Sequence, residues 1–185
     1  MTKPRTIEFY DASVTADCER MLVTLLSGLG PWKESVYLVG GLTPRYLVRA
    51  QPPEVRAHAG TADVDLVIDL AVLANTEAYQ TLEANLKAMG FERAENDKGA
   101  KVNWRWRMWT EDGTAVILEF LSDDPNLSGG QMQELPTKGN LSAVQVPHAS
   151  IVKDLHDKIV IEAERLTDKA LTKETIAYAN IVSFT

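Results

Sequence analysis

The fold is decided by two stretches, YLVGG at residues 37–41 and TADVDLVI at residues 61–68. The first is a short apolar run that stops at a glycine pair, and this pattern predicts a buried strand leading into a tight turn. In the second, aspartates alternate with apolar residues, and residues i and i+2 share one face of a strand. We therefore expect Asp63 and Asp65 to project side by side.

Two carboxylates on one strand face repel each other, and this repulsion raises the pKa of one of them. A divalent cation removes the conflict, because Mg²⁺ prefers oxygen ligands and is usually held by one or two carboxylates together with substrate phosphates. The alternative is an exposed strand end that carries two solvated aspartates. The Asp-x-Asp spacing alone leaves both interpretations open.

A third acidic residue, Glu119, lies inside the strand-like run AVILEFL at residues 115–121. An ionised carboxylate among large apolar side chains is rarely buried unless it is paired or bound to a metal. Two kinds of partner are open: a metal ion shared with the two aspartates, or an arginine of the preceding segment, Arg105 or Arg107.

The order of strand, Gly-Gly turn, helix, Asp-x-Asp strand and later acidic strand resembles the nucleotidyltransferase (polymerase-β-like) superfamily, and most of all its AbiEii/AbiGii branch, whose members are often toxins of toxin–antitoxin pairs. The residues that carry the resemblance are Gly40, Gly41, Thr61, Asp63, Asp65 and Glu119. The resemblance implies an α+β fold with a mixed β-sheet flanked by helices over residues 1–146. It also implies a C-terminal helical segment, residues 147–185, packed on that domain.

The resemblance further implies metal-dependent transfer of an NMP from an NTP to an acceptor hydroxyl on RNA, a protein or a small molecule. The implied catalytic ligands of one or two Mg²⁺ ions are Asp63, Asp65 and Glu119. The implied triphosphate-binding residues are Gly40, Gly41, Thr43 and Lys158. The sequence does not choose among tRNA, a protein and a small molecule as acceptor, and a cognate antitoxin is a further candidate partner.

The C-terminal region departs from the family pattern. Lys158 and Arg165 match two basic positions on one face of the helix expected from Pro147 to about residue 167, but residues 173–182 lack the aspartates expected there. The departure supports an alternative function, a catalytically degenerate nucleotidyltransferase fold that binds nucleotide or a protein partner. For Lys158 the alternative is a surface residue of that helix.

Hydrophobic periodicity predicts the remaining elements. Helices are expected over residues 15–29 and from Asn75 or Thr76 to Met89, and a last strand over residues 141–146. Thr43 at the N-cap and Pro44 in the first turn predict a helix after the glycine pair. Alternating apolar and polar residues over 102–108 predict a strand, which a turn at residues 111–114 joins to the Glu119 strand as a hairpin. Core packing is the favoured role of the strand's tryptophans over base stacking.

Composition bounds the class of protein. The 185 residues are 45% hydrophobic, which suits one globular domain. There is no apolar run long enough to span a membrane and no signal-peptide pattern, so a cytoplasmic location is expected.

The single cysteine, Cys18, excludes an internal disulfide and is expected in the core. A net charge of −7 argues against non-specific coating of nucleic acid. It leaves room for local basic groups, and one candidate is Arg45, Arg49 and Arg56.

Overall fold

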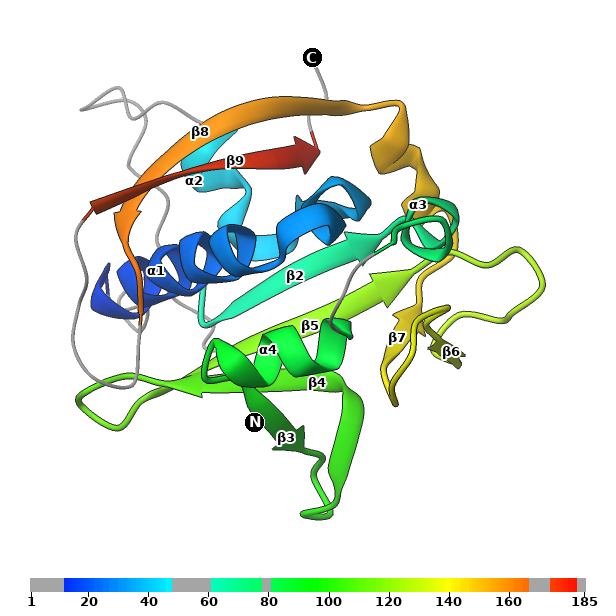
Figure 1. The fold of residues 1–185 in the computed structure, drawn as a ribbon, viewed down its shortest axis with the longest axis horizontal. Helices are drawn as coiled ribbons and strands as arrows, with labels where there is room; N and C mark the ends of the chain where they lie inside the picture. Colours follow the sequence, from blue (N-terminus) through cyan, green and yellow to red (C-terminus); the bar gives the residue numbers. More distant parts are fainter. Residues whose placement is uncertain (1–11, 48–60, 78–80, 167–173, 183–185) are drawn as a thin grey trace.

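The computed structural model describes residues 12–47, 61–77, 81–166 and 174–182. These residues form an α+β fold in which helices flank a mixed nine-stranded sheet (Figure 1). The elements are α1 Ala12–Gly28, the 3₁₀ helix η2 Gly30–Ser35, β1 Val36–Val39, η3 Gly40–Leu42, α2 Pro44–Leu47, β2 Asp63–Ile68, α3 Leu70–Ala74, α4 Leu82–Ala88, β3 Glu92–Glu95, β4 Lys101–Trp109, β5 Ala115–Ser122, β6 Met132–Glu134, β7 Ser142–Gln145, η4 Ala149–Lys153, β8 His156–Glu164 and β9 Glu174–Val182.

The sheet has the strand order β3-β4-β5-β2-β1-β9-β8, and β7 pairs with both β5 and β6. The pairs β2–β5, β1–β9 and β5–β7 are parallel, and the other pairs are antiparallel. The first two predicted strands, β1 and β2, are therefore neighbours at the centre of the sheet. Segments far apart in sequence meet there.

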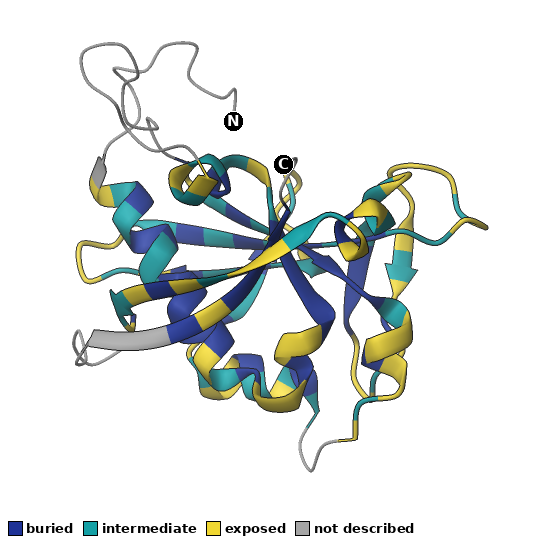
Figure 2. Ribbon diagram, turned by 90° about the horizontal axis from the view of Figure 1, so that it is seen from above, coloured by how far each residue is buried: buried dark blue, intermediate teal, exposed yellow. Residues whose placement is uncertain are grey.

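The prediction of a helix over residues 15–29 is confirmed by α1. Its apolar residues recur at helical spacing, and the side chains of Met21, Leu22, Leu25 and Leu26 are buried. Each fully buried side chain of this size contributes about 1.5–3 kcal/mol relative to exposure. With α4 they form the main core on one face of the sheet, and buried residues gather at the centre of the molecule (Figure 2).

The β4–β5 hairpin is also confirmed. The two strands are antiparallel, and Gly113 in the turn has φ +81°. Residues along β5 alternate: Leu118 and Phe120 are buried, whereas Glu119 between them is only partly buried. Trp106 of β4 is fully buried, as expected of a core residue. The odd-numbered residues of β5 therefore lie on the sheet face opposite α1.

The helix predicted from Asn75 or Thr76 to Met89 begins in the wrong place. Within the predicted range α4 begins only after Thr81, and a separate short helix, α3, ends before that range; each has its own N-cap. Asp69 accepts hydrogen bonds from two backbone N–H groups of α3, at 2.9 and 3.2 Å. Thr81 accepts one from the N–H of Ala84, at 3.0 Å. A side-chain oxygen at the N-cap satisfies a donor that has no partner within the helix, which is why helices start at these residues.

The helix predicted from Pro147 to about residue 167 is wrong. Only the short 3₁₀ helix η4 follows the proline, and then β8 begins. In β8 the run Ile159-Val160-Ile161 is β-branched, which favours a strand, and alternate residues such as Ile161 and Ala163 turn toward the core. The C-terminal segment therefore adds the strands β8 and β9 to the sheet instead of a helical layer.

The candidate basic group lies only partly within the described residues. Two of its members, Arg49 and Arg56, lie outside them. The third member, Arg45, pairs with Glu19 at 2.6 Å. Among the described residues, no helix has the length and apolar character needed to cross a bilayer.

Candidate functional site

The glycine turn is in direct contact with the aspartate strand. Val39, the last residue of β1, lies opposite Asp65 of β2, so the chain turns immediately beside that carboxylate. A Cβ on Gly40 would lie 2.1 Å from Asp65 Oδ2, and Gly40 has φ +73°. A Cβ on Gly41 would lie 2.8 Å from Thr61 Oγ1. A side chain at either position would clash with Asp65 or Thr61, so the turn needs glycine at both.

Helix α1 fixes the start of the aspartate strand. The backbone N–H of Thr61 donates to Thr15 Oγ1 at 3.2 Å, and the Cys18 thiol donates to the carbonyl of Thr61 at 3.4 Å. Thr61 Oγ1 in turn donates to Asp63 Oδ1 at 2.6 Å. Cys18 is buried in the core as predicted, and burial followed by the charge of Asp63 raises the pKa of its thiol to about 12.

The sheet brings together the three predicted acidic residues. Asp63 and Asp65 alternate with buried residues on β2, as expected of residues on one strand face. The parallel pairing of β2 with β5 places Glu119 directly opposite Asp65. Neighbouring strands lie about 4.8 Å apart, so the two carboxylate-bearing positions are adjacent. All three lie on the face opposite α1.

Glu119 is held by an arginine. Arg105 lies opposite it in the β4–β5 hairpin, and Arg105 Nη2 and Nε lie 2.6 and 2.7 Å from Glu119 Oε1. Arg105 also stacks over the ring of Trp104, with its guanidinium carbon 4.5 Å from the ring centroid. Arg107 pairs with Glu92 instead. Of the two partners left open for Glu119, the structure shows the arginine, so a cation of the protein itself adjoins the carboxylates.

The helix predicted after the glycine pair is confirmed by α2, which begins at Pro44, but the buried side chain of Thr43 does not cap it. The backbone angles of Thr43, φ −55° and ψ −47°, are helical, whereas an N-cap residue is typically extended. Its N–H donates to the carbonyl of Gly40 at 3.2 Å. Its hydroxyl has no hydrogen-bond partner among the described residues. Thr43, Gly40 and Leu121 line a mainly apolar pocket of about 460 Å³ on the same face of the sheet.

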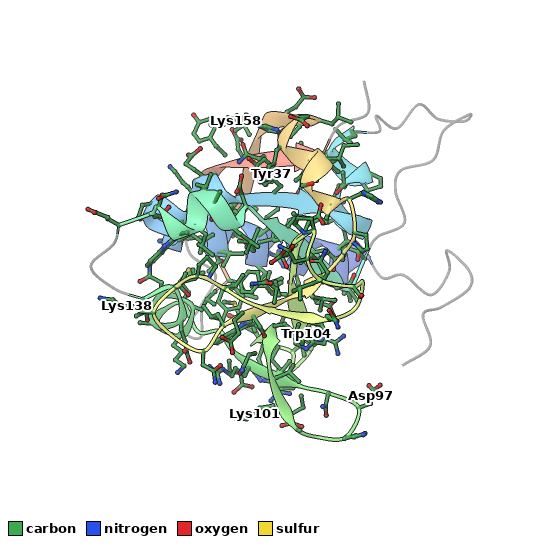
Figure 3. The ribbon with its side chains drawn as sticks, turned by 90° about the vertical axis from the view of Figure 1, so that its right-hand side faces the viewer. Tyr37, Asp97, Lys101, Trp104, Lys138 and Lys158 are labelled. Carbon is green, nitrogen blue, oxygen red and sulfur yellow. The ribbon has the colours of Figure 1, made fainter. Side chains whose placement is uncertain are left out.

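Lys158 lies apart from the glycine turn. It is in register with Asn180 of β9, which is in register with Tyr37 of β1, so three strand spacings of about 4.8 Å separate β8 from the aspartate strand. Its ammonium group is 3.2 Å from Glu34. Figure 3 shows Lys158 and Tyr37 at one end of the molecule and Trp104 toward the other. The helix from which Lys158 was expected to reach a triphosphate is absent, because this segment is β8.

Within the described ranges, no three His, Cys, Asp or Glu residues are grouped in a way that could hold a metal ion by themselves. Arg105 is one of the two arginines that the sequence offered as partners of Glu119. The hairpin register is the signal that selects it over Arg107. No protein-family model, curated protein or solved structure matches the chain.

Proposed function

We propose that the chain is a metal-dependent nucleotidyltransferase that moves an NMP from an NTP to an acceptor hydroxyl. The observation that carries the proposal is the contact between Gly40 and Asp65. It places a turn without side chains against a strand that bears two carboxylates on one face. A triphosphate lying on the turn would have its phosphates beside those carboxylates, and one or two carboxylates together with substrate phosphates are the usual ligands of Mg²⁺.

The exposed backbone of the turn fits a bound triphosphate. Gly40 is exposed to solvent, and it has no side chain because Asp65 occupies the space where a Cβ would lie. A ligand can therefore approach the backbone of Gly40 closely. The hydroxyl of Thr43 follows the glycines but is buried, so it takes no part in this contact. The residues that would hold the cation are Asp63 and Asp65. When bound, Mg²⁺ supplies charge neutralisation of the phosphates during in-line displacement.

Glu119 has a more limited role in this proposal than the resemblance implies. Both hydrogen bonds from Arg105 end on Oε1, which leaves Oε2 to face a cation or an acceptor hydroxyl. Lys158 has no role in it, because its ammonium group lies beside Glu34. The choice of acceptor among tRNA, a protein and a small molecule, and the presence of an antitoxin partner, stay predictions from the resemblance.

A second candidate function is nucleotide or partner binding without catalysis. The observation that favours it is the Arg105–Glu119 ion pair, which engages the third acidic residue in a structural contact. A fold that retains the glycine turn and two aspartates but has lost the third ligand would bind a metal–nucleotide complex and not turn it over.

The test is a thermal-shift measurement with each NTP, with and without Mg²⁺. A ligand at about 100 times its Kd adds about 2.7 kcal/mol to the free energy of unfolding, so binding should be visible. Asp63→Asn and Asp65→Asn should abolish the Mg²⁺-dependent shift, and Asp157→Asn, an exposed position of β8, should retain it. Labelled NTP and candidate acceptors then separate the two functions, because only the first predicts a labelled acceptor. No shift with any nucleotide would refute nucleotidyl transfer and nucleotide binding, and of the two functions it would leave only partner binding.

A further inference from the structure

Strand β8 is a long edge of the sheet. In the described part of the chain β8 pairs with β9 alone, at the end of the strand order (Figure 1). It spans nine residues, about 30 Å of backbone at 3.3 Å per residue. The opposite edge, β3, has four residues and an irregular register between Arg93 and Glu95, which is how natural edges are commonly blunted. The long edge at β8 has no comparable interruption.

The face of the β8–β9 hairpin is apolar at its centre. Tyr178 is 64% exposed and Val160 is 53% exposed, the two highest values among the large apolar side chains of the described residues. They lie directly opposite each other in the β8–β9 register. An exposed apolar row thus runs across the hairpin up to the edge of the sheet, where another strand would extend it.

The sequence of β8 is complementary to itself in one antiparallel register. If two copies pair with Val160 opposite Val160, Lys158 of each copy faces Glu162 of the other, and Ile159 faces Ile161. Moving the centre of pairing to residue 159 places Lys158 opposite Val160. Moving it to residue 161 places Val160 opposite Glu162. In the register centred on residue 161, Lys158 also faces a carboxylate, that of Glu164, but the exposed Val160 faces Glu162. Of these three symmetric registers, only the one centred on Val160 places Val160 opposite an apolar residue and Lys158 opposite a glutamate, and such cross-strand pairs stabilise a sheet.

We propose that β8 pairs antiparallel with β8 of a second copy of this chain, around a two-fold axis through Val160. The exposed row then becomes continuous across the dimer, from Tyr178 and Val160 of one copy to Val160 and Tyr178 of the other. Cross-strand pairing also satisfies the outward backbone N–H and C=O groups of both edges. The proposal is independent of the proposed enzymatic function.

The charged residues of β8 are consistent with a specific partner. Lysine and glutamate on an edge disfavour pairing with most other strands. The present contact of Lys158 with Glu34 joins side chains that are 62% and 54% exposed, so it contributes little and is readily exchanged for a partner's carboxylate. In the register centred on Val160, the same charges attract instead of repel.

The dimer also determines where the two candidate sites lie. Lys158, Asn180 and Tyr37 form one row across the sheet, on the face that also carries Asp65. A two-fold axis perpendicular to the sheet keeps that face common to both copies. Both glycine turns would therefore open toward the same side of the dimer.

Cross-linking tests the register directly, because a residue meets its own copy only at the two-fold axis. With Val160→Cys, copper-phenanthroline oxidation should join two chains, since cross-strand Cβ atoms lie about 4.5–5.5 Å apart. The matched control is Lys158→Cys, whose two copies would be offset by four residues, about 13 Å. Cys18 is buried and should stay inert. Equal cross-linking of both variants, or of neither, would overturn the proposal.

Mass measurement by light scattering tests the charge pairing. At about 100 μM, which populates a complex of micromolar Kd, the wild-type chain should have twice its 20.4 kDa mass. Lys158→Glu and Glu162→Lys should each be monomeric, and the double exchange should restore the dimer. Glu34→Lys breaks the existing contact and should leave the dimer intact. A monomeric wild type, or a double exchange that stays monomeric while its circular dichroism spectrum is native, would overturn the proposal.

Discussion

Replacing Gly40 with alanine tests whether the glycine turn and the aspartate strand pack as described. The new Cβ would lie 2.1 Å from Asp65 Oδ2, 3.0 Å from its Cγ and 3.1 Å from its Cβ. Ordinary contacts begin at 3.4 Å, so the carboxylate would have to move by more than 1 Å. The backbone at Gly40 also has φ +73°, a left-handed conformation that alanine adopts at a cost.

The two effects have separate magnitudes. The left-handed conformation costs a residue with a Cβ about 1–2 kcal/mol. Forcing an extra methyl group into a packed contact typically costs about 1–3 kcal/mol. The Gly40→Ala variant should therefore lose about 2–5 kcal/mol of its free energy of unfolding. This is a large part of the about 5–15 kcal/mol that stabilises a typical domain.

Gly113→Ala is the matched control, and urea unfolding followed by circular dichroism is the assay. Gly113 has φ +81°, and a Cβ there would meet nothing within 4 Å, so this variant carries the backbone cost alone. The excess loss in Gly40→Ala, about 1–3 kcal/mol, measures the clash with Asp65. In an Asp65→Ala background that excess should shrink, because the two closest atoms are gone. If both glycine variants lose the same stability, the contact between Gly40 and Asp65 is not as described.

Three further predictions follow from other contacts. Thr81→Ala should lower the free energy of unfolding by about 1 kcal/mol because its hydroxyl caps α4, whereas Thr76→Ala should change it by less than about 0.5 kcal/mol. Burial raises the pKa of Cys18 from 9.0 to about 12. The contribution of the protonated thiol to the free energy of unfolding is therefore fully present below pH 9.0 and is lost as the pH rises toward 12. In urea unfolding, Cys18→Ala should reduce this loss at high pH. Arg105→Gln releases Glu119 and, under the proposed function, should increase the Mg²⁺-dependent thermal shift; an unchanged shift would remove Glu119 from the metal site.

Local patterns are sufficient for the centre of the fold. The apolar spacing in α1 predicts a helix and the alternation in β2 predicts a strand, because apolar residues on a buried face recur with the period of the element. The alternation therefore places Asp63 and Asp65 on one face correctly. The contact of the glycine pair with Asp65 and Thr61 is beyond the reach of local patterns, because it depends on the antiparallel register of β1 with β2.

The partner of Glu119 shows why register limits such reasoning. A two-residue loop at Asp112-Gly113 would place Arg105 opposite Phe120. The observed hairpin pairs Trp109 with Ala115 and so places Arg105 opposite Glu119. A shift of one residue moves every side chain of a strand to the other face. The sequence names Arg105 and Arg107 as candidates, and the choice between them depends on whether the hairpin is centred on residue 112, as observed, or on residue 113.

The helix expected in the C-terminal segment is wrong for a different reason. A run such as Ile159-Val160-Ile161 is short and apolar, and periodicity does not distinguish a strand from a buried helix in such a run. Its state is set by pairing with β9, which begins ten residues after β8 ends. Tertiary pairing of this kind overrides the start signal at Pro147.

The two aspartates of the Asp-x-Asp motif look equivalent in sequence, and the fold makes them different. Asp63 accepts a hydrogen bond from Thr61 and lies opposite Ile117 on β5. Asp65 lies opposite Val39 on one side and Glu119 on the other, and its carboxylate fills the space beside Gly40. A change at Asp65 thus alters the packing at Gly40 together with the carboxylate cluster, whereas a change at Asp63 alters the cluster and the hydrogen bond from Thr61. Asp65→Asn keeps the shape and removes the charge, so comparing it with Asp65→Ala separates electrostatics from packing at the point where the three strands meet.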